Sequence, residues 1–579
     1  MKHFFRLMAW AALTLAAPVV AAPTYAMAGS LVSNFIPQLG PNARQRYKDI
    51  FVAIREGRWE DAQQGLDSMP EGPLHNVARA ELYLAKGSPK ATPEQLAAIL
   101  AQAPYLPQAA QLARLAKSRG LVTDAPLPMA RDLVFLGSAP RRTRTSQTDD
   151  SSAASLNATI QPLIKDNLPF EAEAIVLDNE PNMSLEGRTE LFQRVAWSYY
   201  ITGETDAARR VAALCQLGIG QWAAACDWTQ GLAAWRQGDY PAALTAFESA
   251  AVRFQDNDMA AAGRFWAARA AMAAGQPHKV DAHLKAAARN AETFYGMLAA
   301  DRLGLPNTVQ AVPDNIAEVE SLPNVRAALA LAEIDETELA DEIIRWQARI
   351  GDPRKHAALA TLAGRMDLPA TQLWLAHNGP AGAKAPVSAR YPMPRTWVPE
   401  GGWRVDRALV YAHALQESQF RPAVVSPAGA KGLMQVMPGT AAMMARQKGK
   451  GKVGSLSDPA TNMEYGQSFI ERLRDMNITG GMLPKVIAAY NAGPQPVDIW
   501  NQRSRDNPDP LLYIESIPYW ETRAYVTIIL RNYWMYQLQS GADTTSLSAL
   551  SQGLWPRFPG LPGPTAVRID QAGGASGAH

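Results

Sequence analysis

A repeated helical pattern with regularly spaced glycines most constrains the fold of this chain. Segments of aromatic and small residues, such as the run from Trp197 to Gly203, end in a glycine turn and are followed by a second helical pattern. The turn glycines Gly203, Gly238 and Gly275 are 35 and 37 residues apart, a period typical of stacked helix pairs. Because each pair buries its small-residue face on its neighbour, the pattern predicts an α-helical solenoid with a concave side.

Breaks in this pattern divide the 579 residues into several predicted domains. We expect a mainly all-α fold in which the solenoid precedes a smaller helical linker domain and a compact C-terminal domain. A stretch rich in Arg, Ser, Thr and Asp within the solenoid predicts a flexible loop, and the Gly, Pro and Ala-rich end of the chain predicts a disordered tail. The expected limits are 29–306 for the solenoid, about 140–155 for its loop, 307–385 for the linker, 386–545 for the compact domain and 546–579 for the tail.

The arginines of the predicted loop, Arg141, Arg142 and Arg144, are open to two interpretations. Contact with an anionic polymer is one, and a solvated loop, which we favour, is the other. The formal net charge of the chain is only +2, so composition does not indicate a nucleic-acid partner.

Residues 1–28 have the organisation of a secretory signal peptide. Lys2, His3 and Arg6 precede an apolar run, and Ala26-Met27-Ala28 precedes the expected cleavage site. An uncleaved anchor is the alternative, although the run is short for a membrane span. The mature chain is therefore expected to be soluble, in an oxidising compartment.

The sequence contains two cysteines, Cys215 and Cys226, separated by 11 residues. This spacing fits the two arms of a helical hairpin, and in an exported protein a disulfide is one interpretation. Two buried free thiols are the other. Two cysteines without nearby histidines do not form a zinc-site pattern.

Glu417 is the strongest candidate for a chemical role. It lies at the end of residues 408–418, a predicted helix that is apolar on nearly every side and is therefore expected to be buried. Burial disfavours the charged form of a carboxyl, so we expect a raised pKa that keeps Glu417 protonated near neutral pH, ready to donate a proton. His413 lies one turn earlier, but without a third ligand nearby we expect no metal ion.

The residues that follow Glu417 offer no obvious second catalytic carboxylate. Between Glu417 and Ile470 the other acidic residues are Asp458, at a predicted helix start, and Glu464, in mid-helix. Glycosidases that use two carboxylates need a nucleophile or base at a defined distance from the acid. The absence of such a residue fits chemistry in which the substrate supplies the second group.

Four short sequence blocks follow one another from Glu417 onward: Glu417-Ser418, Gly432-Leu433-Met434-Gln435, Ala489-Tyr490-Asn491-Ala492-Gly493-Pro494 and Glu521-Thr522-Arg523. Taken in order, they resemble the catalytic domain of the soluble lytic murein transglycosylases. The resemblance is strongest over about 391–535 and weaker over about 195–306. It implies a lysozyme-like α+β domain attached to a superhelical ring, and peptidoglycan glycan strands as the partner.

The resemblance implies a mechanism as well. Glu417 would protonate the oxygen between N-acetylmuramic acid and N-acetylglucosamine, and the 2-acetamido group would stabilise the anomeric carbon. Glu417 would then deprotonate the muramic C6 hydroxyl, closing a 1,6-anhydro ring without water, metal or organic cofactor. A periplasmic location would follow, with cell-wall synthesis or remodelling proteins as further partners. A goose-type lysozyme that uses water and an inactive glycan-binding scaffold are the alternatives.

The remaining site residues are carried over by position in these blocks. Ser426 would lie near the acid, although Ser-Pro is also a simple turn start, and Met437 would face the cleft unless it fills the core. Glu521 would bind substrate, with an ordinary helix-face pair to Arg523 as the alternative. Gln435 and Tyr490 are also expected to touch the substrate, and the motif is expected to be supported by Ser418, Gly432, Leu433, Met434, Asn491, Gly493 and Arg523.

Overall fold

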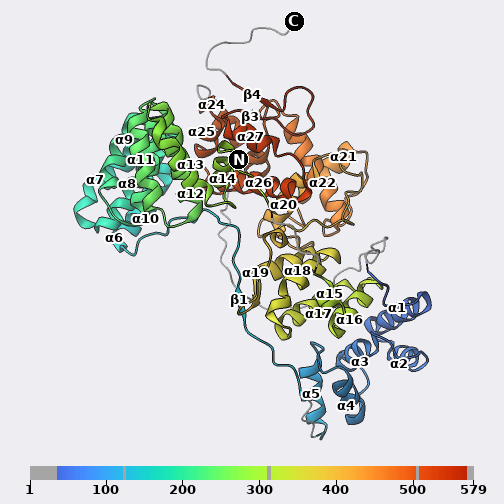
Figure 1. Cartoon of the computed structure of the whole chain (residues 1–579). Coiled ribbons are helices and arrows are strands. Elements are labelled where there is room, and N and C mark those ends of the chain that lie inside the picture. The colour runs from blue at the N-terminus through green and yellow to red at the C-terminus, as the bar shows by residue number, and fades with distance from the viewer. Residues whose placement is uncertain (1–34, 122–125, 310–314, 504–507, 570–579) are drawn as a thin grey trace. The chain divides into compact units, whose positions relative to one another are not determined.

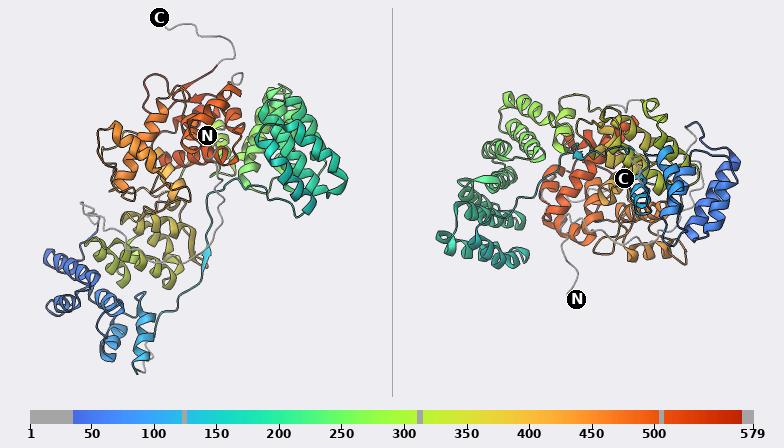
Figure 2. Two further views of the ribbon diagram at one scale, coloured as in Figure 1. Left: turned by 180° about the vertical axis from the view of Figure 1, so that it is seen from behind. Right: turned by 90° about the horizontal axis from the view of Figure 1, so that it is seen from below.

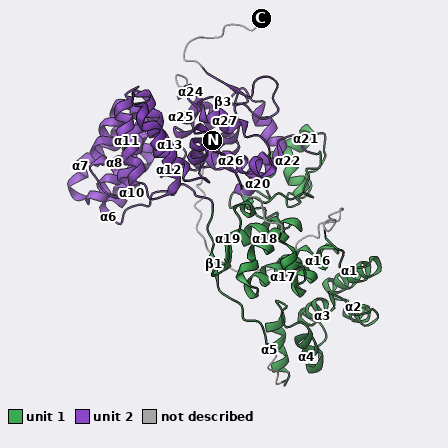
Figure 3. Ribbon diagram, viewed as in Figure 1, with its two compact units in different colours: residues 1–138, 310–402, 417–464 green, residues 139–309, 403–416, 465–579 purple. Residues whose placement is uncertain are grey.

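The computed structural model describes residues 35–121, 126–309, 315–503 and 508–569. The chain divides into two compact units, which are coloured separately in Figure 3. Unit 1 comprises residues 1–138, 310–402 and 417–464, and unit 2 comprises residues 139–309, 403–416 and 465–579. The predicted signal peptide, residues 1–28, lies outside the described residues.

The described residues of unit 1 form short helices and one pair of strands. Proline or a capping side chain begins several of them, as at α4, where Thr92 and Gln95 form a capping box. The helices are α1 (Pro41–Glu56), α2 (Trp59–Asp67), α3 (His75–Leu84), α4 (Pro93–Gln102), α5 (Ala109–Ser118), α15 (Ala317–Glu320), α16 (Pro323–Ala332), α17 (Thr337–Ile350), η3 (Pro353–Lys355), α18 (His356–Arg365), α19 (Pro369–His377), η4 (Val387–Arg390) and α21 (Pro438–Gln447).

Helices far apart in the sequence share the core of unit 1. Tyr47 and Phe51 of α1 belong to the same buried apolar cluster as Val325 of α16 and Leu359 of α18. Strand β1 (Leu133–Phe135) pairs antiparallel with β2 (Asn378–Pro380) and closes the unit. The N-terminal helices therefore belong with the predicted linker segment, and not, as predicted, with the solenoid over 29–306.

The solenoid forms the first part of unit 2, where each helix packs against the next (Figures 1 and 2). Gly203, Gly238 and Gly275 have φ of 93°, 76° and 71°, a left-handed conformation that glycine adopts without strain, so the predicted turns are confirmed. The helices are α6 (Ser151–Lys165), α7 (Pro169–Asn179), η1 (Glu180–Asn182), α8 (Leu185–Thr202), α9 (Thr205–Gln216), α10 (Gly220–Arg236), α11 (Tyr240–Arg253), α12 (Asn257–Ala273), η2 (Pro277–Lys279), α13 (Val280–Ala288) and α14 (Phe294–Arg302).

Small residues let these helices approach closely around large aromatic rings. The ring of Trp266, which is fully buried, meets the ring of Trp235 edge-on at 5.3 Å between centroids and lies 5.4 Å from Phe247. Cys215 of α9 and Cys226 of α10 are joined in a disulfide. Of the two interpretations left open by the sequence, the disulfide is therefore the one observed.

The segment at 140–155 differs from the predicted flexible loop. The nitrogen of Thr148 donates to Glu190 (2.7 Å) and the indole of Trp222 donates to the carbonyl of Ser146 (2.9 Å), and helix α6 already begins at Ser151. Arg142 is buried, with its guanidinium on two carboxylates. Polar groups of residues 140–155 thus bond to buried partners inside unit 2. The interpretation of Arg142 as part of a solvated loop is wrong.

The C-terminal elements complete unit 2. Helix α26 is buried over most of its length, and its Trp534 ring stacks on Phe294 of α14 at 5.2 Å. The elements are α20 (Arg407–Ser418), α22 (Pro459–Arg474), α23 (Leu483–Ala492), α24 (Pro494–Arg503), α25 (Pro510–Glu515), α26 (Trp520–Ser540), α27 (Thr545–Ser551), β3 (Trp555–Pro556) and β4 (Ala566–Val567). Helices α20 and α22 extend across the division between the two units.

The predicted disordered tail over 546–579 is ordered over its described part. Strands β3 and β4 pair antiparallel, and Trp555 and Phe558 are each 2% exposed. The Trp555 indole donates to the carbonyl of Pro508 at 2.7 Å. These two large apolar side chains gain burial that outweighs the Gly and Pro content of the segment; residues 570–579 lie outside the described part.

The predicted mainly α-helical class is confirmed, with strands limited to two short pairs in the described residues. None of the helices in this part of the chain combines the length and apolarity that crossing a bilayer requires.

Candidate active site

Helix α20 carries Glu417 at its C-terminal end. All residues from Ala408 to Leu415 are buried, as the apolar pattern predicted, whereas the side chain of Glu417 is half-buried. Glu417 is thus at the point where a buried helix reaches the surface. A carboxyl in such a place combines partial desolvation with access to a ligand.

The chain turns sharply after Glu417. Ser418 is buried, and Gln419 and Phe420 both have left-handed backbone conformations, with φ of 54° and 59°. Consecutive non-glycine residues in this conformation are strained and persist only where the surroundings hold them. Phe420 is 1% exposed and its ring lies 6.3 Å from that of Trp397, so its burial holds the turn.

Arg421 caps the end of this helix. Its backbone nitrogen and Nε donate to the carbonyl oxygen of Ser418 at 3.2 and 3.0 Å. These bonds satisfy a carbonyl group that the helix itself leaves without a partner.

The Gly432–Gln435 block forms a tight loop, and its contacts are with other residues of unit 1. Gly432 has φ 75°, and a Cβ at this position would lie 2.1 Å from the carbonyl oxygen of Leu456. Gln435 is left-handed too, with φ 48°, and its Nε2 donates to the carbonyls of Gly432 (2.8 Å) and Val424 (3.2 Å). Leu433 and Met434 are buried, so the loop is anchored by its apolar members.

Asn462 holds this loop and was not identified from the sequence. It is fully buried; its Oδ1 accepts from the nitrogen of Met434 (2.8 Å), and its Nδ2 donates to the carbonyls of Lys431 and Leu456 (2.8 Å each). Every polar atom of its side chain is used. An Asn in the first turn of a predicted helix is the only sequence signal that marks it.

Ser426 and Met437 flank the loop in unit 1. The Ser426 hydroxyl accepts from the nitrogen of Ala430 at 3.0 Å, so the turn interpretation is confirmed, and its role beside the acid stays a prediction. Met437 precedes α21 and is 40% exposed. The alternative of Met437 as core filler is therefore wrong.

Tyr490 and the residues after it belong to unit 2. The half-buried Tyr490 ring lies 4.7 Å from the imidazole of His413 and 5.4 Å from Phe469. Asn491 Oδ1 accepts from the Thr522 hydroxyl at 2.6 Å, which ties the end of α23 to the start of α26. Gly493 ends α23 with φ 83°, as expected for a turn-forming glycine.

Glu521 and Arg523 have different surroundings at the start of α26. Glu521 is exposed in the first turn, where the helix dipole favours a negative charge. Arg523 Nη1 donates to the carbonyl of Ile517 (2.7 Å), and its guanidinium lies 4.3 Å above the Trp197 ring of α8. Arg523 is thus anchored inward on the solenoid, and the described contacts do not include the surface pair with Glu521 that was the alternative.

The acidic residues near Glu417 in the sequence have structural partners. Asp458 caps α22 by accepting from the nitrogen of Thr461 at 2.8 Å. Glu464 is buried, pairs with Lys448 and accepts from the nitrogen of Gly401 at 3.1 Å. Neither is arranged as a nucleophile. The described residues also contain no group of three or more His, Cys, Asp or Glu side chains placed to hold a metal ion.

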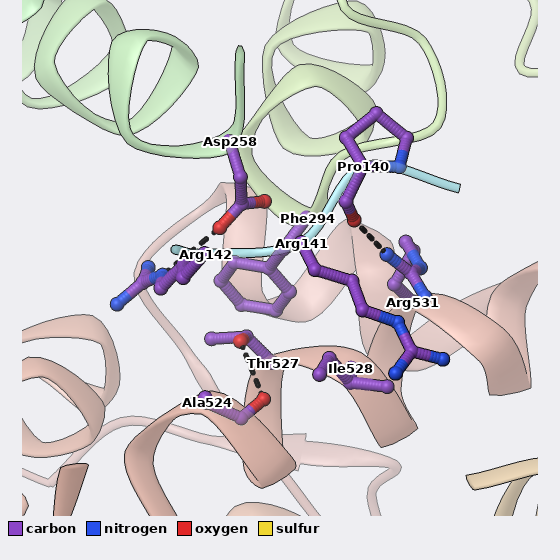
Figure 4. A pocket seen from close by; sticks show the side chains of 9 residues that line it. All are labelled: Pro140, Arg141, Arg142, Asp258, Phe294, Ala524, Thr527, Ile528 and Arg531. Atoms are coloured by element: carbon purple, nitrogen blue, oxygen red, sulfur yellow. Dashed lines mark hydrogen bonds and ion pairs between the residues drawn. The ribbon is translucent and has the colours of Figure 1, made fainter. Parts of the chain in front are cut away.

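Figure 4 shows a hollow in unit 2 that is lined by Pro140, Arg142, Asp258 and Phe294 together with residues of α26. The Pro140 carbonyl accepts from Arg531 at 2.5 Å, and the lining side chains leave no room for a water molecule. The hollow is a packed junction between elements of unit 2, and the candidate site residues lie outside its lining.

Comparison with known proteins gives a family for one segment of the chain. Residues 399–512 match the transglycosylase SLT domain. The soluble lytic murein transglycosylase of Escherichia coli strain K12 is 37% identical over 155 residues, which are 26% of this chain and 24% of that protein. The membrane-bound lytic murein transglycosylase C of Actinobacillus succinogenes is 34% identical over 119 residues, 19% of this chain and 32% of that protein. The sequence match therefore spans about a quarter to a third of the length of these relatives.

The fold comparison extends over more of the chain. The 70 kDa soluble lytic transglycosylase of Escherichia coli aligns with a TM-score of 0.50 at 18% identity, over 89% of this chain and 99% of that one. The lytic transglycosylase Slt of Pseudomonas aeruginosa aligns with a TM-score of 0.50 at 19% identity, over 86% of each chain. At this identity the likeness shows a shared fold. The comparisons therefore relate residues 399–512 to the transglycosylase SLT domain and the fold of the chain to that of the soluble lytic transglycosylases.

Proposed function

We propose that the protein is a lytic transglycosylase that cleaves the β-1,4 bond between N-acetylmuramic acid and N-acetylglucosamine in peptidoglycan. Glu417 is the general acid, and the products carry 1,6-anhydromuramic ends. The observation that carries the proposal is the placement of Glu417 at the exposed end of buried helix α20, within the segment that matches the SLT domain.

One carboxyl, that of Glu417, gives a proton in the first step of the proposed reaction and takes one back in the second. Glu417 donates its proton to the glycosidic oxygen, which leaves as the 4-hydroxyl of N-acetylglucosamine while the 2-acetamido oxygen bonds to the anomeric carbon. The carboxylate of Glu417 then takes the proton of the muramic C6 hydroxyl, whose oxygen attacks the anomeric carbon and releases the acetamido group. Glu417 ends protonated, and no water is consumed.

The structural roles of Asp458 and Glu464 support a substrate-assisted route. Both carboxylates are engaged by a helix end or an ion pair, so neither is presented as a nucleophile. In substrate-assisted glycosidases a group of the substrate itself takes the place of the protein nucleophile, and in peptidoglycan that group is the 2-acetamido group.

The other site residues are proposed to bind and orient the glycan. In unit 1, Gln435 belongs to the strained loop and Ser426 and Met437 flank it in the sequence. In unit 2, Tyr490 has a hydroxyl and Glu521 an exposed carboxylate. We place the mature enzyme in the periplasm, where peptidoglycan is accessible, with cell-wall synthesis or remodelling proteins as further partners.

Product analysis tests the proposal. Purified murein digested by the wild type should release 1,6-anhydromuropeptides in mass spectra. Glu417→Gln should lower the rate by about 10²–10⁴-fold, since the amide cannot transfer the proton. Glu471→Gln is a matched control, because Glu471 has no role in the proposed chemistry and forms an ion pair with Arg404 (3.0 Å). Reducing ends in place of anhydro ends would identify a goose-type lysozyme, and intact murein would identify a glycan-binding scaffold.

A further inference from the structure

The imidazole of His413 is a buried polar group with no role in the proposed chemistry. It is 1% exposed and lies four residues before Glu417 on helix α20. Residues at this spacing share one face of a helix. His413 is therefore a buried polar residue on the helix face that leads to the proposed acid.

The hydrogen bonds of His413 define its tautomer. Nδ1 lies 2.9 Å from the carbonyl oxygen of Leu409, and because a carbonyl only accepts, Nδ1 carries the proton. Nε2 is then a bare acceptor; it is buried and has no hydrogen-bond partner in the described part of the chain. Burial lowers the pKa of His413 to about 4, so the ring is neutral at physiological pH.

The principal ring neighbour of His413 is Tyr490. The two ring centroids are 4.7 Å apart at 62° between planes, and Tyr525 lies further away at 6.1 Å. On another side Tyr490 meets Phe469 of α22 at 5.4 Å. The Tyr490 ring is thus in contact with one aromatic ring from α20 and one from α22, while α23 carries its backbone.

We propose that His413 is a positioning residue for the reaction: its neutral imidazole fixes the Tyr490 ring against Phe469 and so sets where the Tyr490 hydroxyl meets the bound glycan. This inference rests on the proposed function. An aromatic ring packed against neighbours on two sides has few positions available to it. A small displacement of a group that contacts the substrate, here the Tyr490 hydroxyl, can lower the rate strongly.

The test is a double-mutant cycle between His413 and Tyr490 on the full-length protein. His413→Ala should lower kcat on soluble muropeptide oligomers by about 10²-fold with KM changed by less than threefold. In the Tyr490→Phe background, which lacks the hydroxyl, the same change should cost less than threefold, because there is no hydroxyl left to position. His413→Phe, which restores a ring beside Tyr490, should recover most of the rate.

Tyr411→Ala is the matched control. Tyr411 is a buried aromatic residue of the same helix, and its ring packs on Trp403 and Tyr536. Two residues from His413, it points to nearly the opposite side of α20. Tyr411→Ala should lower Tm as much as His413→Ala while leaving kcat within threefold at a temperature where both variants are folded.

The outcomes separate this inference from the proposed function. A wild-type protein that releases no anhydro products contradicts the proposed function and the inference with it. An active wild type in which His413→Ala and Tyr490→Phe lower kcat additively, or in which Tyr411→Ala causes the same loss of kcat, overturns the positioning role alone.

Discussion

Arg142 and Glu515, 373 residues apart in the sequence, form a buried two-point ion pair with N–O distances of 2.8 and 2.7 Å. Arg142 Nε also donates to Asp258 (2.9 Å), and the Tyr295 hydroxyl donates to Glu515 (2.7 Å). Burial opposes both charges, but their attraction outweighs it, raising the pKa of Arg142 and lowering the pKa of Glu515. The pair ties the segment before α6 to the end of α25.

Removing one partner of this pair should be strongly destabilising. Arg142→Met leaves the Glu515 carboxylate buried without its cation, a change that typically costs about 3–5 kcal/mol. Calorimetry or denaturant unfolding should therefore show a large loss of stability, whereas Arg144→Met, at an exposed position two residues away, should change it by about 0.5 kcal/mol or less. The double variant Arg142→Met with Glu515→Leu removes both charges of the pair and should recover part of the loss, because Asp258 still lacks its cation. An Arg142→Met variant as stable as the wild type would contradict this account.

Gly432→Ala should disrupt the loop beside the proposed acid. The new Cβ would lie 2.1 Å from the Leu456 carbonyl and 2.3 Å from Nδ2 of Asn462, at a backbone φ of 75° that alanine adopts with strain. Because Asn462 also holds Met434, we expect a loss of about 1–3 kcal/mol in stability together with at least a tenfold loss of kcat. Gly439→Ala is the control, since nothing lies within 4 Å of a Cβ there. Equal behaviour of the two variants would show that the close packing at Gly432 is not needed.

The sequence was sufficient for features that depend on local pattern. The helical class follows from periodicity, the turns at Gly203, Gly238 and Gly275 follow from the need for left-handed backbone, and the buried state of residues 408–415 follows from an apolar surface on all sides. Each of these properties is determined within one or two helical turns.

Features that depend on distant partners were missed. The segment around Arg142 is polar in composition, and only the fold brings Asp258 and Glu515 to it. Asn462 is an ordinary polar residue in the first turn of α22 as far as the sequence shows, and only the fold brings the loop at 431–434 against it. The N-terminal helices share a buried apolar core with α16–α19, and no local pattern records a partner more than 200 residues away.

His413 should make stability depend on pH. Its pKa is about 4 in the folded protein against 6.5 as its ordinary value, so between these values the unfolded chain binds a proton that the folded protein excludes. Above about pH 6.5 the ring is neutral in both states and does not affect the free energy of unfolding. As the pH falls from about 6.5 toward 4, the free energy of unfolding should decrease by about 3 kcal/mol in all. Thermal unfolding at a series of pH values should show a shallower decline for His413→Leu than for the wild type. Parallel curves would show that His413 titrates normally in the fold.

Trp555 should anchor the C-terminal strand pair. Its ring is 2% exposed, lies 5.3 Å from Tyr513, and its indole donates to the Pro508 carbonyl. Trp555→Ala removes this buried volume and should cost about 3–5 kcal/mol, measured by denaturant unfolding of the full-length protein. Trp520→Ala is the matched control. Trp520 is 37% exposed, so its replacement by alanine should leave the stability nearly unchanged.

The burial of Trp555 also bears on where a C-terminal fragment should end. A fragment ending at residue 545 lacks all but the first residue of α27 and the whole β3–β4 pair. Residues 386–569 retain the contacts of Trp555 with Tyr513 and of the Phe558 nitrogen with the Gly481 carbonyl (2.7 Å). The longer fragment should therefore unfold at a higher temperature than 386–545.

If the chemistry is carried by Glu417 and its neighbours, the longer fragment should still release anhydro products from short muropeptide oligomers. It should lose rate on intact sacculi, because the solenoid that would contact remote parts of a long glycan is absent. A fragment that is folded by circular dichroism yet inactive on short oligomers would show that the solenoid completes the active site, which would contradict the assignment of the chemistry to the residues from Glu417 to Arg523.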